Sequence, residues 1–298
     1  MTARTYATPL QFKQALEGRL RNQSTTGADL ARHRQLLIFD RFLARLQRTL
    51  GDALILKGGL ALELRLARAR TTKDIDLRLI GPTDQTLARL QEAARLDLAD
   101  FLTFEVVPDD DHPEIQNDGV RYEGQRFRTE CRLAGKPYGN GFGVDVAFGD
   151  PVSGNVETLE CDRILDFIGV DPPSIQIYPI ETHIAEKLHA YTMPRPRPNS
   201  RVKDLPDMAL LGTIRALESR RLRDAIVRTF EFRGTHPVPP SLPQPPAGWA
   251  LPYGAMALSN QLVWRTLVDV TQAAADLMNP VLGGAPGIWD PTSWQWSP

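Results

Sequence analysis

The stretch from residue 53 to residue 80 constrains the fold more than any other part of the chain. It contains a short apolar segment at 53–59 that ends in Gly58 and Gly59, an amphipathic segment at 60–67, and an alternating polar and apolar segment at 73–80. A short apolar run is typical of a buried strand, and strict alternation is typical of a strand with one buried face. The order therefore predicts a strand, a helix and a second strand.

Asp74 and Asp76 lie in the alternating segment and are separated by one residue, Ile75. Side chains alternate along a strand, so both carboxylates should point to the same side, about 6–7 Å apart. Buried carboxylates at such a spacing repel each other, and a divalent cation relieves that repulsion. One or two carboxylates plus substrate phosphates are the usual ligands of Mg²⁺. Gly58 and Gly59 would allow a ligand to approach the backbone and its N–H groups.

Asp145 is a third candidate acid, in the segment 141–150 between Val144 and Val146. An acid on an otherwise apolar strand requires a positive partner or solvent. Asp145 could therefore meet the same cation, form a salt bridge, or lie on a surface face. A lone Asp-x-Asp pair is usually only solvated, so the metal interpretation depends on the glycine pair, the strand–helix–strand context and this third acid.

The remaining pattern divides the chain near residue 180. We expect an α/β domain at 1–180 and a helical domain at 181–298, because strand-like alternation ends where the second range begins. The proline-rich segment 235–254 is expected to exclude a regular helix. Besides the helix at 60–67, the predicted helices are 9–22, 29–49, one within 81–98, 181–192, two within 205–232 and one at 257–278. The further predicted strands are 104–108, 120–135 and 141–150.

Charge is segregated along the 298 residues, although the net charge is only −1. Residues 1–70 hold 13 Lys and Arg against 5 Asp and Glu, residues 71–186 hold 10 against 23, and residues 187–233 hold 11 against 5. Such segregation can place a basic groove beside a carboxylate cluster, where a phosphate backbone would bind. The alternative is that the charges mix evenly once the chain folds.

Composition excludes several classes of protein. The hydrophobic share of 42% is ordinary for a globular chain, and no window reaches the ~18 uncharged apolar residues of a membrane helix. The beginning of the chain lacks the apolar run of a secretory signal. Cys131 and Cys161 have no CxxC partner, which argues against a disulfide scaffold or a zinc site. A cytoplasmic location is therefore expected.

Four blocks of the sequence together resemble the AbiEii/AbiGii-type nucleotidyltransferase toxins of bacterial type IV toxin–antitoxin systems. The blocks are KGGLAL, RTTKDIDL, ETHIAEKLHAY and RVKDLPDMALL, and they span about residues 54–213. The resemblance implies a nucleotidyltransferase fold like that of DNA polymerase β, with a mixed sheet, N-terminal helices and a C-terminal helical domain. Leu60 departs from the family pattern, which usually has a small residue or threonine after the two glycines.

The resemblance also implies roles for individual residues. Lys187 would neutralise the triphosphate or the departing pyrophosphate, and Asp204 or Asp207 would be the acid that follows the basic block. Without the resemblance, Lys187 is equally well a solvated helix lysine. The implied metal ligands are Asp74, Asp76 and Asp145; the implied catalytic residues are these three with Lys187 and Asp204; the implied nucleotide-binding residues are Lys57, Gly58, Gly59, Thr72, Arg201 and Asp207.

The function that follows from the resemblance is Mg²⁺-dependent transfer of a nucleotide from an NTP to an acceptor, expected to be the 3′ end of tRNA. The outcome would be arrest of translation and growth, and the partners would be tRNA and a cognate antitoxin. The enzyme is expected to be a monomer that does not bind membranes. Two alternatives remain open: nucleotidylation of a protein or small molecule, and a non-catalytic module that binds a nucleotide or partner.

Other conspicuous side chains favour structural roles. His183 and His189 are six residues apart on a predicted helix, not the four that would let them share a metal. The tryptophans near the end of the chain could stack on bases, but core packing is the preferred interpretation. These are Trp249, Trp289, Trp294 and Trp296.

Overall fold

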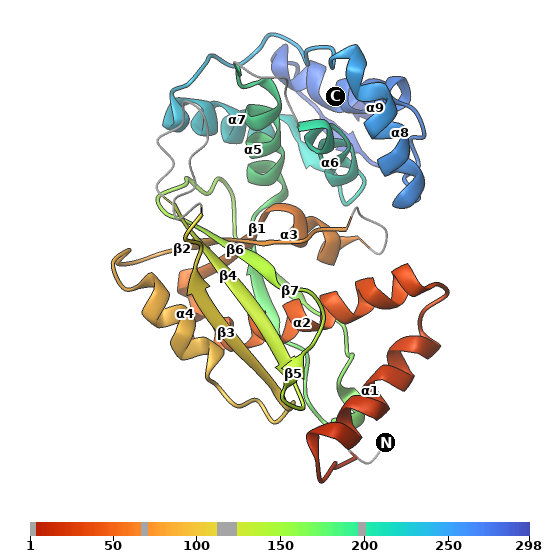
Figure 1. Cartoon of the computed structure of the whole chain (residues 1–298). Helices are drawn as coiled ribbons and strands as arrows, with labels where there is room; N and C mark the ends of the chain where they lie inside the picture. Colours follow the sequence, from red (N-terminus) through yellow and green to blue (C-terminus); the bar gives the residue numbers. More distant parts are fainter. Residues whose placement is uncertain (1–3, 67–70, 112–123, 196–200) are drawn as a thin grey trace.

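The computed structural model describes residues 4–66, 71–111, 124–195 and 201–298 (Figure 1). Within these ranges, a mixed eight-stranded sheet has the order β3-β4-β6-β2-β1-β8-β7, and β5 pairs with β4. β2 runs parallel to β6 and β1 runs parallel to β8, whereas the other neighbours are antiparallel. The strands are β1 Leu54–Lys57, β2 Ile75–Leu79, β3 Leu102–Pro108, β4 Gly124–Leu133, β5 Lys136–Pro137, β6 Phe142–Ala147, β7 Glu157–Glu160 and β8 Ser174–Ile177.

The helices of the first half are α1 Pro9–Asn22, α2 Gly27–Leu50, α3 Gly58–Arg65 and α4 Thr86–Ala94. Threonine side chains cap α1 and α2, because Thr8 and Thr26 each accept a hydrogen bond from a backbone N–H in the first turn. α2 is fixed to the α4–β3 connection by buried ion pairs from Arg41 and Arg45 to Asp100, at 2.9 and 2.7 Å. These contacts hold α2 against the sheet that carries the site.

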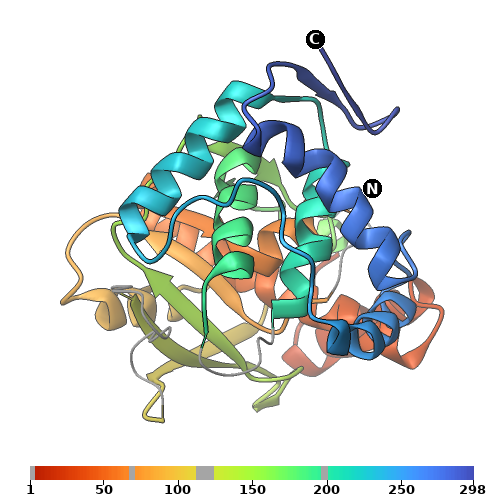
Figure 2. The ribbon, with the colours of Figure 1, turned by 90° about the horizontal axis from the view of Figure 1, so that it is seen from above.

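The second half is mainly helical and lies above the sheet in Figure 1; Figure 2 shows its helices from above. Its helices are α5 Ile180–Thr192, α6 Asp204–Gly212, α7 Ser219–Arg233, α8 Ala250–Ser259 and α9 Leu267–Leu282. A small sheet has the order β11-β10-β9, with β9 at Leu217–Glu218, β10 at Ile288–Asp290 and β11 at Gln295–Ser297. Short 3₁₀ turns lie at Gly51–Ala53, Asp166–Ile168, Arg201–Lys203 and Ala247–Trp249.

The buried apolar side chains form two clusters. One lies between the sheet and α1, α2 and α4, and the other lies among α5 to α9. α3 contributes to both, because Leu60 and Ala61 belong to the first cluster and Leu62 to the second. The tryptophans pack as predicted: Trp289 is fully buried and its ring contacts those of Trp294 and Trp296.

Two predictions for the C-terminal half were wrong. The single helix predicted at 257–278 is two helices, because α8 ends at Ser259, Gln261 takes a left-handed φ of 52°, and Thr266 with Asp269 forms a capping box that starts α9. The segment 235–254 was expected to exclude a regular helix, but α8 begins within it at Ala250. Pro252 is tolerated there because it lies in the first turn, where a backbone N–H has no acceptor within the helix. Strands β7 to β11 were not predicted.

Within the described ranges, every helix is too short or too polar to cross a membrane. Cys131 and Cys161 are both buried, and neither is in a disulfide. The sequence also predicts an acidic loop at 108–119, of which residues 112–119 lie outside the described ranges. The predicted division into domains at residue 180 stays a prediction.

Candidate functional site

The parallel pairing of β2 with β6 brings two of the three predicted acids together, and the third lies just before β2. In this register Asp76 lies directly opposite Asp145. Asp74 comes just before β2, and its Oδ1 accepts a hydrogen bond from the backbone N–H of Gly143 at 3.2 Å. Asp74 is exposed, whereas Asp76 and Asp145 are half-buried. The three carboxylates therefore differ in their exposure to solvent, and Asp76 and Asp145 lie on neighbouring central strands of the sheet.

Gly58 makes room for Asp76. It is the first residue of α3 and has a φ of +66°, a conformation that favours glycine. A Cβ atom at this position would stand 1.9 Å from Oδ2 of Asp76, a collision that neither group could avoid by a small shift. The next residue, Gly59, is buried in the first turn of α3. The glycine pair thus allows the helix to begin directly against the acid.

Asp76 lies close to another carboxylate and to several lysines, and these charges act on its pKa in opposite directions. Burial raises the pKa of Asp76 above its ordinary value, and repulsion from Asp145 raises it further. The charges of Lys187, Lys57 and Lys203 oppose this rise in pKa. A cation bound between the carboxylates would relieve the same repulsion.

Arg126 already contacts one of these carboxylates. It lies on β4 opposite Asp145 in the antiparallel register, and its Nε and Nη2 atoms donate to the two carboxylate oxygens of Asp145, both at 2.7 Å. The sequence analysis missed this residue. The alternation in β4 indicates which residues share a face, but only the pairing of β4 with β6 identifies the partner.

Lys57 lies at the end of β1, opposite Asp76 in the β1–β2 register. Its buried ammonium group contacts Asp150 at 2.5 Å and Glu186 at 3.1 Å. Arg233 of α7 also contacts Glu186, at 3.2 Å. This ion-pair network joins the sheet to α5 and α7, and it fixes the position of a positive charge beside Asp76.

Lys187 contacts both Asp204 and Asp207, the two acids that the sequence left as alternatives. Its Nζ lies 2.8 Å from Asp207 and 3.4 Å from Asp204, and both acids are fully buried at the start of α6. Arg201 contacts Asp204 at 3.5 Å. Asp204 and Asp207 therefore position the lysine, and Asp207 makes the shorter contact.

Thr72 supports the loop that leads into β2. Its backbone N–H donates to Oε2 of Glu63 at 2.9 Å, and its hydroxyl donates to the carbonyl oxygen of Asp74 at 3.3 Å. Arg32 of α2 donates to the other oxygen of Glu63 at 2.8 Å. Glu63 is a further residue that the sequence analysis missed; its signal was a buried charge in the apolar run LALEL.

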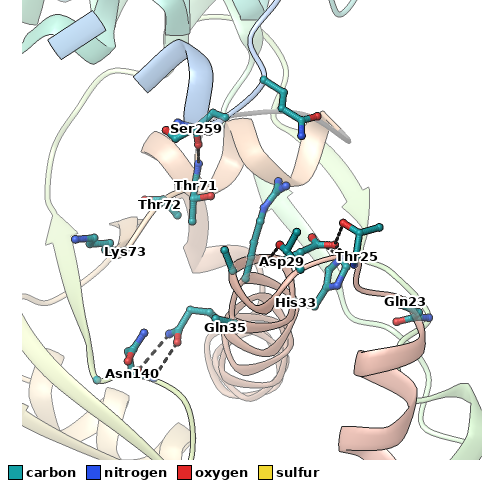
Figure 3. Close-up of a pocket in the computed structure, with 17 residues that line it drawn as sticks. Gln23, Thr25, Asp29, His33, Gln35, Thr71, Thr72, Lys73, Asn140 and Ser259 are labelled. Carbon is teal, nitrogen blue, oxygen red and sulfur yellow. Dashed lines mark hydrogen bonds and ion pairs between the residues drawn. The ribbon is translucent and has the colours of Figure 1, made fainter. Parts of the chain in front are cut away.

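A cleft of about 890 Å³ is lined in part by the loop that precedes β2. Figure 3 shows its walls, which come from the N-terminal part of α2, the loop 71–73, the turn at Asn140, and the end of α8. The lining is mainly amide and hydroxyl groups. Lys73 forms part of its wall, whereas Asp74, Asp76 and Asp145 are not among the residues that line it.

The site also suits a hard divalent cation in its donor chemistry. In the part of the chain that the structure describes, no group of three His, Cys, Asp or Glu side chains could by itself hold a metal. Asp76 and Asp145 nevertheless supply carboxylate oxygens from neighbouring strands, and Asp74 supplies them from the residue before β2. Mg²⁺ usually completes such an incomplete carboxylate set with water and substrate phosphates. The three acids therefore fit this metal.

The fold thus carries acids on two parallel neighbouring strands, and a strand, a glycine pair and a helix precede them in the chain. Residues 41–272 match the family model described as "Nucleotidyl transferase AbiEii toxin, Type IV TA system". The chain belongs to this family. It is therefore a nucleotidyltransferase and a toxin of a toxin–antitoxin system.

Several solved structures are similar to this chain to different degrees. MenT4, a nucleotidyltransferase toxin from Mycobacterium tuberculosis, is similar with a TM-score of 0.55 and 16% identity, over 97% of this chain and 93% of that chain. JHP933 from Helicobacter pylori gives a TM-score of 0.48 and 15% identity, over 85% of this chain and 94% of its own. A second H. pylori structure, titled a nucleotidyltransferase, gives 0.46 and 14%, over 85% and 96%. A comparison with curated protein sequences gave no match.

Proposed function

We propose that the enzyme uses Mg²⁺ to transfer a nucleotide from an NTP to the 3′ end of tRNA, which blocks translation and growth. The observation that carries this proposal is the register that places Asp76 opposite Asp145 on one side and opposite Lys57 on the other. Carboxylates suited to a metal and a cation suited to a triphosphate thus lie on three adjacent central strands of the sheet. Phosphoryl chemistry depends mainly on such positioning and charge neutralisation.

Each side chain then has a definite part in the reaction. Asp74, Asp76 and Asp145 would hold Mg²⁺, which when bound lowers the pKa of an attacking hydroxyl and neutralises charge on the triphosphate. Lys187, fixed by its contacts with Asp204 and Asp207, would attract the triphosphate and the departing pyrophosphate. Asp145, held by two hydrogen bonds from Arg126, is the candidate to receive the proton of the acceptor hydroxyl.

Lys57 and Arg201 complete the proposed nucleotide-binding side. Lys57 is buried at the end of β1, where its ion pair with Asp150 fixes its charge. Arg201 contacts Asp204, which fixes its charge at the start of α6. Thr72 would keep the loop before Asp74 in place through its contact with Glu63. Gly58 and Gly59 would leave the start of α3 open to the reacting groups.

The proposed acceptor and partners follow from charge and family. The basic segments at 1–70 and 187–233 favour a polyanionic acceptor, and the toxin family favours a cognate antitoxin. We propose that the enzyme acts as a monomer in the cytoplasm, where tRNA is available. Gel filtration of the purified chain with and without tRNA would test the oligomeric state.

The test is transfer of label. The purified full chain is incubated with each labelled NTP, Mg²⁺ and total tRNA, beside the Asp76→Ala variant. Label in the tRNA band that is lost in the variant and lost with EDTA is the expected result. Label only in protein would instead support protein nucleotidylation, and label in neither would contradict the proposal.

A further inference from the structure

The helix α3 contacts both Asp76 and the loop before β2. At its start, Gly58 lies against the carboxylate of Asp76 and leaves no room there for a Cβ atom. In its last turn, Glu63 accepts a hydrogen bond from the backbone N–H of Thr72, two residues before Asp74. One short helix therefore constrains the carboxylate of one proposed metal ligand and the backbone that carries the other.

Glu63 is an unfavourable residue for this position unless its charge has a use. It is buried in the run LALEL, between Leu62 and Leu64, and Leu60 and Ala61 before it are buried too. It also lies in the last turn of α3, where the helix dipole disfavours a negative charge. A buried charge costs free energy of folding unless it is paired and hydrogen-bonded. An apolar residue would serve the packing of α3 better, so the contacts of the carboxylate must account for its presence.

Both oxygens of the Glu63 carboxylate accept hydrogen bonds. Oε2 accepts from the backbone N–H of Thr72 at 2.9 Å, and Oε1 accepts from Nε of Arg32 on α2 at 2.8 Å. The side chain of Glu63 is 1% exposed, whereas that of Arg32 is 26% exposed. The carboxylate thus joins three parts of the chain, α2, α3 and the loop before β2, and its orientation is fixed by donors on two of them.

The loop transmits this constraint to Asp74. The hydroxyl of Thr72 donates to the carbonyl oxygen of Asp74 at 3.3 Å, next to the backbone N–H that Glu63 holds. On the β6 side, Oδ1 of Asp74 accepts from the backbone N–H of Gly143 at 3.2 Å. The side chain of Asp74 is exposed and therefore little constrained by packing. Hydrogen bonds of this kind consequently decide where its carboxylate lies.

We infer that Glu63 is a positioning residue, which holds the loop before β2 so that Asp74 binds the metal together with Asp76. The inference rests on the proposed function, because it takes these carboxylates to bind Mg²⁺. Groups that orient metal ligands without touching the metal contribute strongly to affinity, and the loss of one typically weakens metal binding about 10–100-fold. Glu63 acts through Thr72 and therefore sets the metal affinity without being a ligand.

The variant Glu63→Gln tests this role with almost no change of shape. Two N–H donors meet the carboxylate, but an amide side chain has a single acceptor oxygen and can satisfy only one of them. Glu17→Gln is the matched control. Glu17 of α1 accepts hydrogen bonds from Arg34 of α2 at 2.8 and 2.7 Å, and its other partner is Tyr138. The control therefore removes an ion pair to the same helix, but with partners outside the loop before β2.

Mn²⁺ is titrated into each full-length protein with NTP present, and binding is followed by electron paramagnetic resonance. We expect the Kd for Mn²⁺ to rise about tenfold in Glu63→Gln and to stay unchanged in Glu17→Gln, although the melting temperature falls in both. Equal Mn²⁺ affinity in Glu63→Gln and wild type would overturn the inference alone. A wild type that binds no Mn²⁺ would overturn the proposed metal site and the inference with it.

Hydrogen exchange at the backbone N–H of Thr72, measured by NMR without metal, tests the same contact directly. In the wild type this N–H should exchange at least about tenfold more slowly than in an unstructured peptide, although Thr72 lies outside any helix or strand. Exchange should become faster in Glu63→Gln and stay slow in Glu17→Gln. If Glu63→Gln does not fold, the wild type decides: slow exchange at Thr72 supports the inference, and exchange at the rate of an unstructured peptide overturns it.

Discussion

At the residue scale, the spacing of Asp74 and Asp76 predicts that both carboxylates point to the same side of a strand, because alternation along a strand is a local property. Their environment was not predictable in the same way. The contact of Arg126 with Asp145 depends on the register of β4 against β6, which brings together residues 19 positions apart. The sequence likewise showed a glycine pair, but not that Gly58 lies against the carboxylate of Asp76.

The first prediction concerns Gly58. In Gly58→Ala the new methyl group would displace the carboxylate of Asp76, and a displacement of about 1 Å in a reacting centre can lower the rate about 100-fold. Transfer activity is therefore expected to fall by about that factor, measured with labelled NTP. Gly18→Ala is the control, because nothing lies within 4 Å of the new methyl group on α1. Unchanged activity in Gly58→Ala would show that Asp76 need not occupy its present position.

A second prediction concerns the repulsion at Asp76. Burial and Asp145 both raise the pKa of Asp76, so the charged form costs free energy of folding when no metal is bound. In EDTA, Asp76→Asn should therefore raise the melting temperature by a few degrees, at about 2–4 °C for each kcal/mol in a chain of this size, while transfer activity is lost. A lower melting temperature would mean that the carboxylate stabilises the fold. Differential scanning calorimetry measures this change.

At the element scale, α5 and α6 hold the lysine of the site between two acids. Lys187 lies 2.8 Å from Asp207 and 3.4 Å from Asp204. Asp207→Asn should reduce transfer activity more than Asp204→Asn, because it removes the charge in closer contact. Circular dichroism of both variants is the control for folding, since the loss of one partner from a buried pair can cost about 3–5 kcal/mol. A larger loss of activity in a folded Asp204→Asn would contradict the assignment.

The buried histidines of α5 give a prediction about pH. Burial lowers the pKa of His183 well below its ordinary value, and burial with the nearby charge of Arg233 lowers the pKa of His189 to about 3. The unfolded chain binds protons on these groups near pH 6.5, but the folded chain does not. Stability is therefore complete above about pH 6.5 and is lost progressively as the pH falls below it.

NMR measures this directly. The ring signals of His183 and His189 should stay at their neutral positions from about pH 8 to pH 5, as long as the protein remains folded. A midpoint near 6.5 for either ring would contradict the account, because it would mean that the ring is open to water in the folded state. The hydrogen bond between Nε2 of His189 and Thr235 is an additional reason to expect a fixed neutral ring.

Helix positions in the first half were largely predictable, and those near the end were not. The predicted helix 9–22 coincides with α1, and the predicted helix 29–49 lies within α2, because both have regular apolar spacing and clear caps. The segment 257–278 has similar spacing throughout, which hid the break between α8 and α9. The capping pair Thr266 and Asp269 was visible in the sequence, and it was the local signal that a second helix begins there.

At the scale of the whole molecule, both halves of the chain contribute residues to the proposed site. The sheet supplies the carboxylates and Lys57, and the helical half supplies Lys187 together with the two acids that hold it. α3 lies between the halves (Figure 1) and packs into both hydrophobic clusters. The sequence could predict both halves but not how they meet, because contacts such as Lys57 with Glu186 join residues 129 positions apart.

The most direct test of the central claim is metal binding by the carboxylates. Mn²⁺, a paramagnetic substitute for Mg²⁺, is titrated into the full-length protein in the presence of NTP and followed by electron paramagnetic resonance. Wild type and Asp84→Asn, which alters an exposed acid outside the site, should bind Mn²⁺ equally, and Asp76→Asn should bind it at least about tenfold more weakly. Equal Mn²⁺ affinity in Asp76→Asn and wild type would contradict the account.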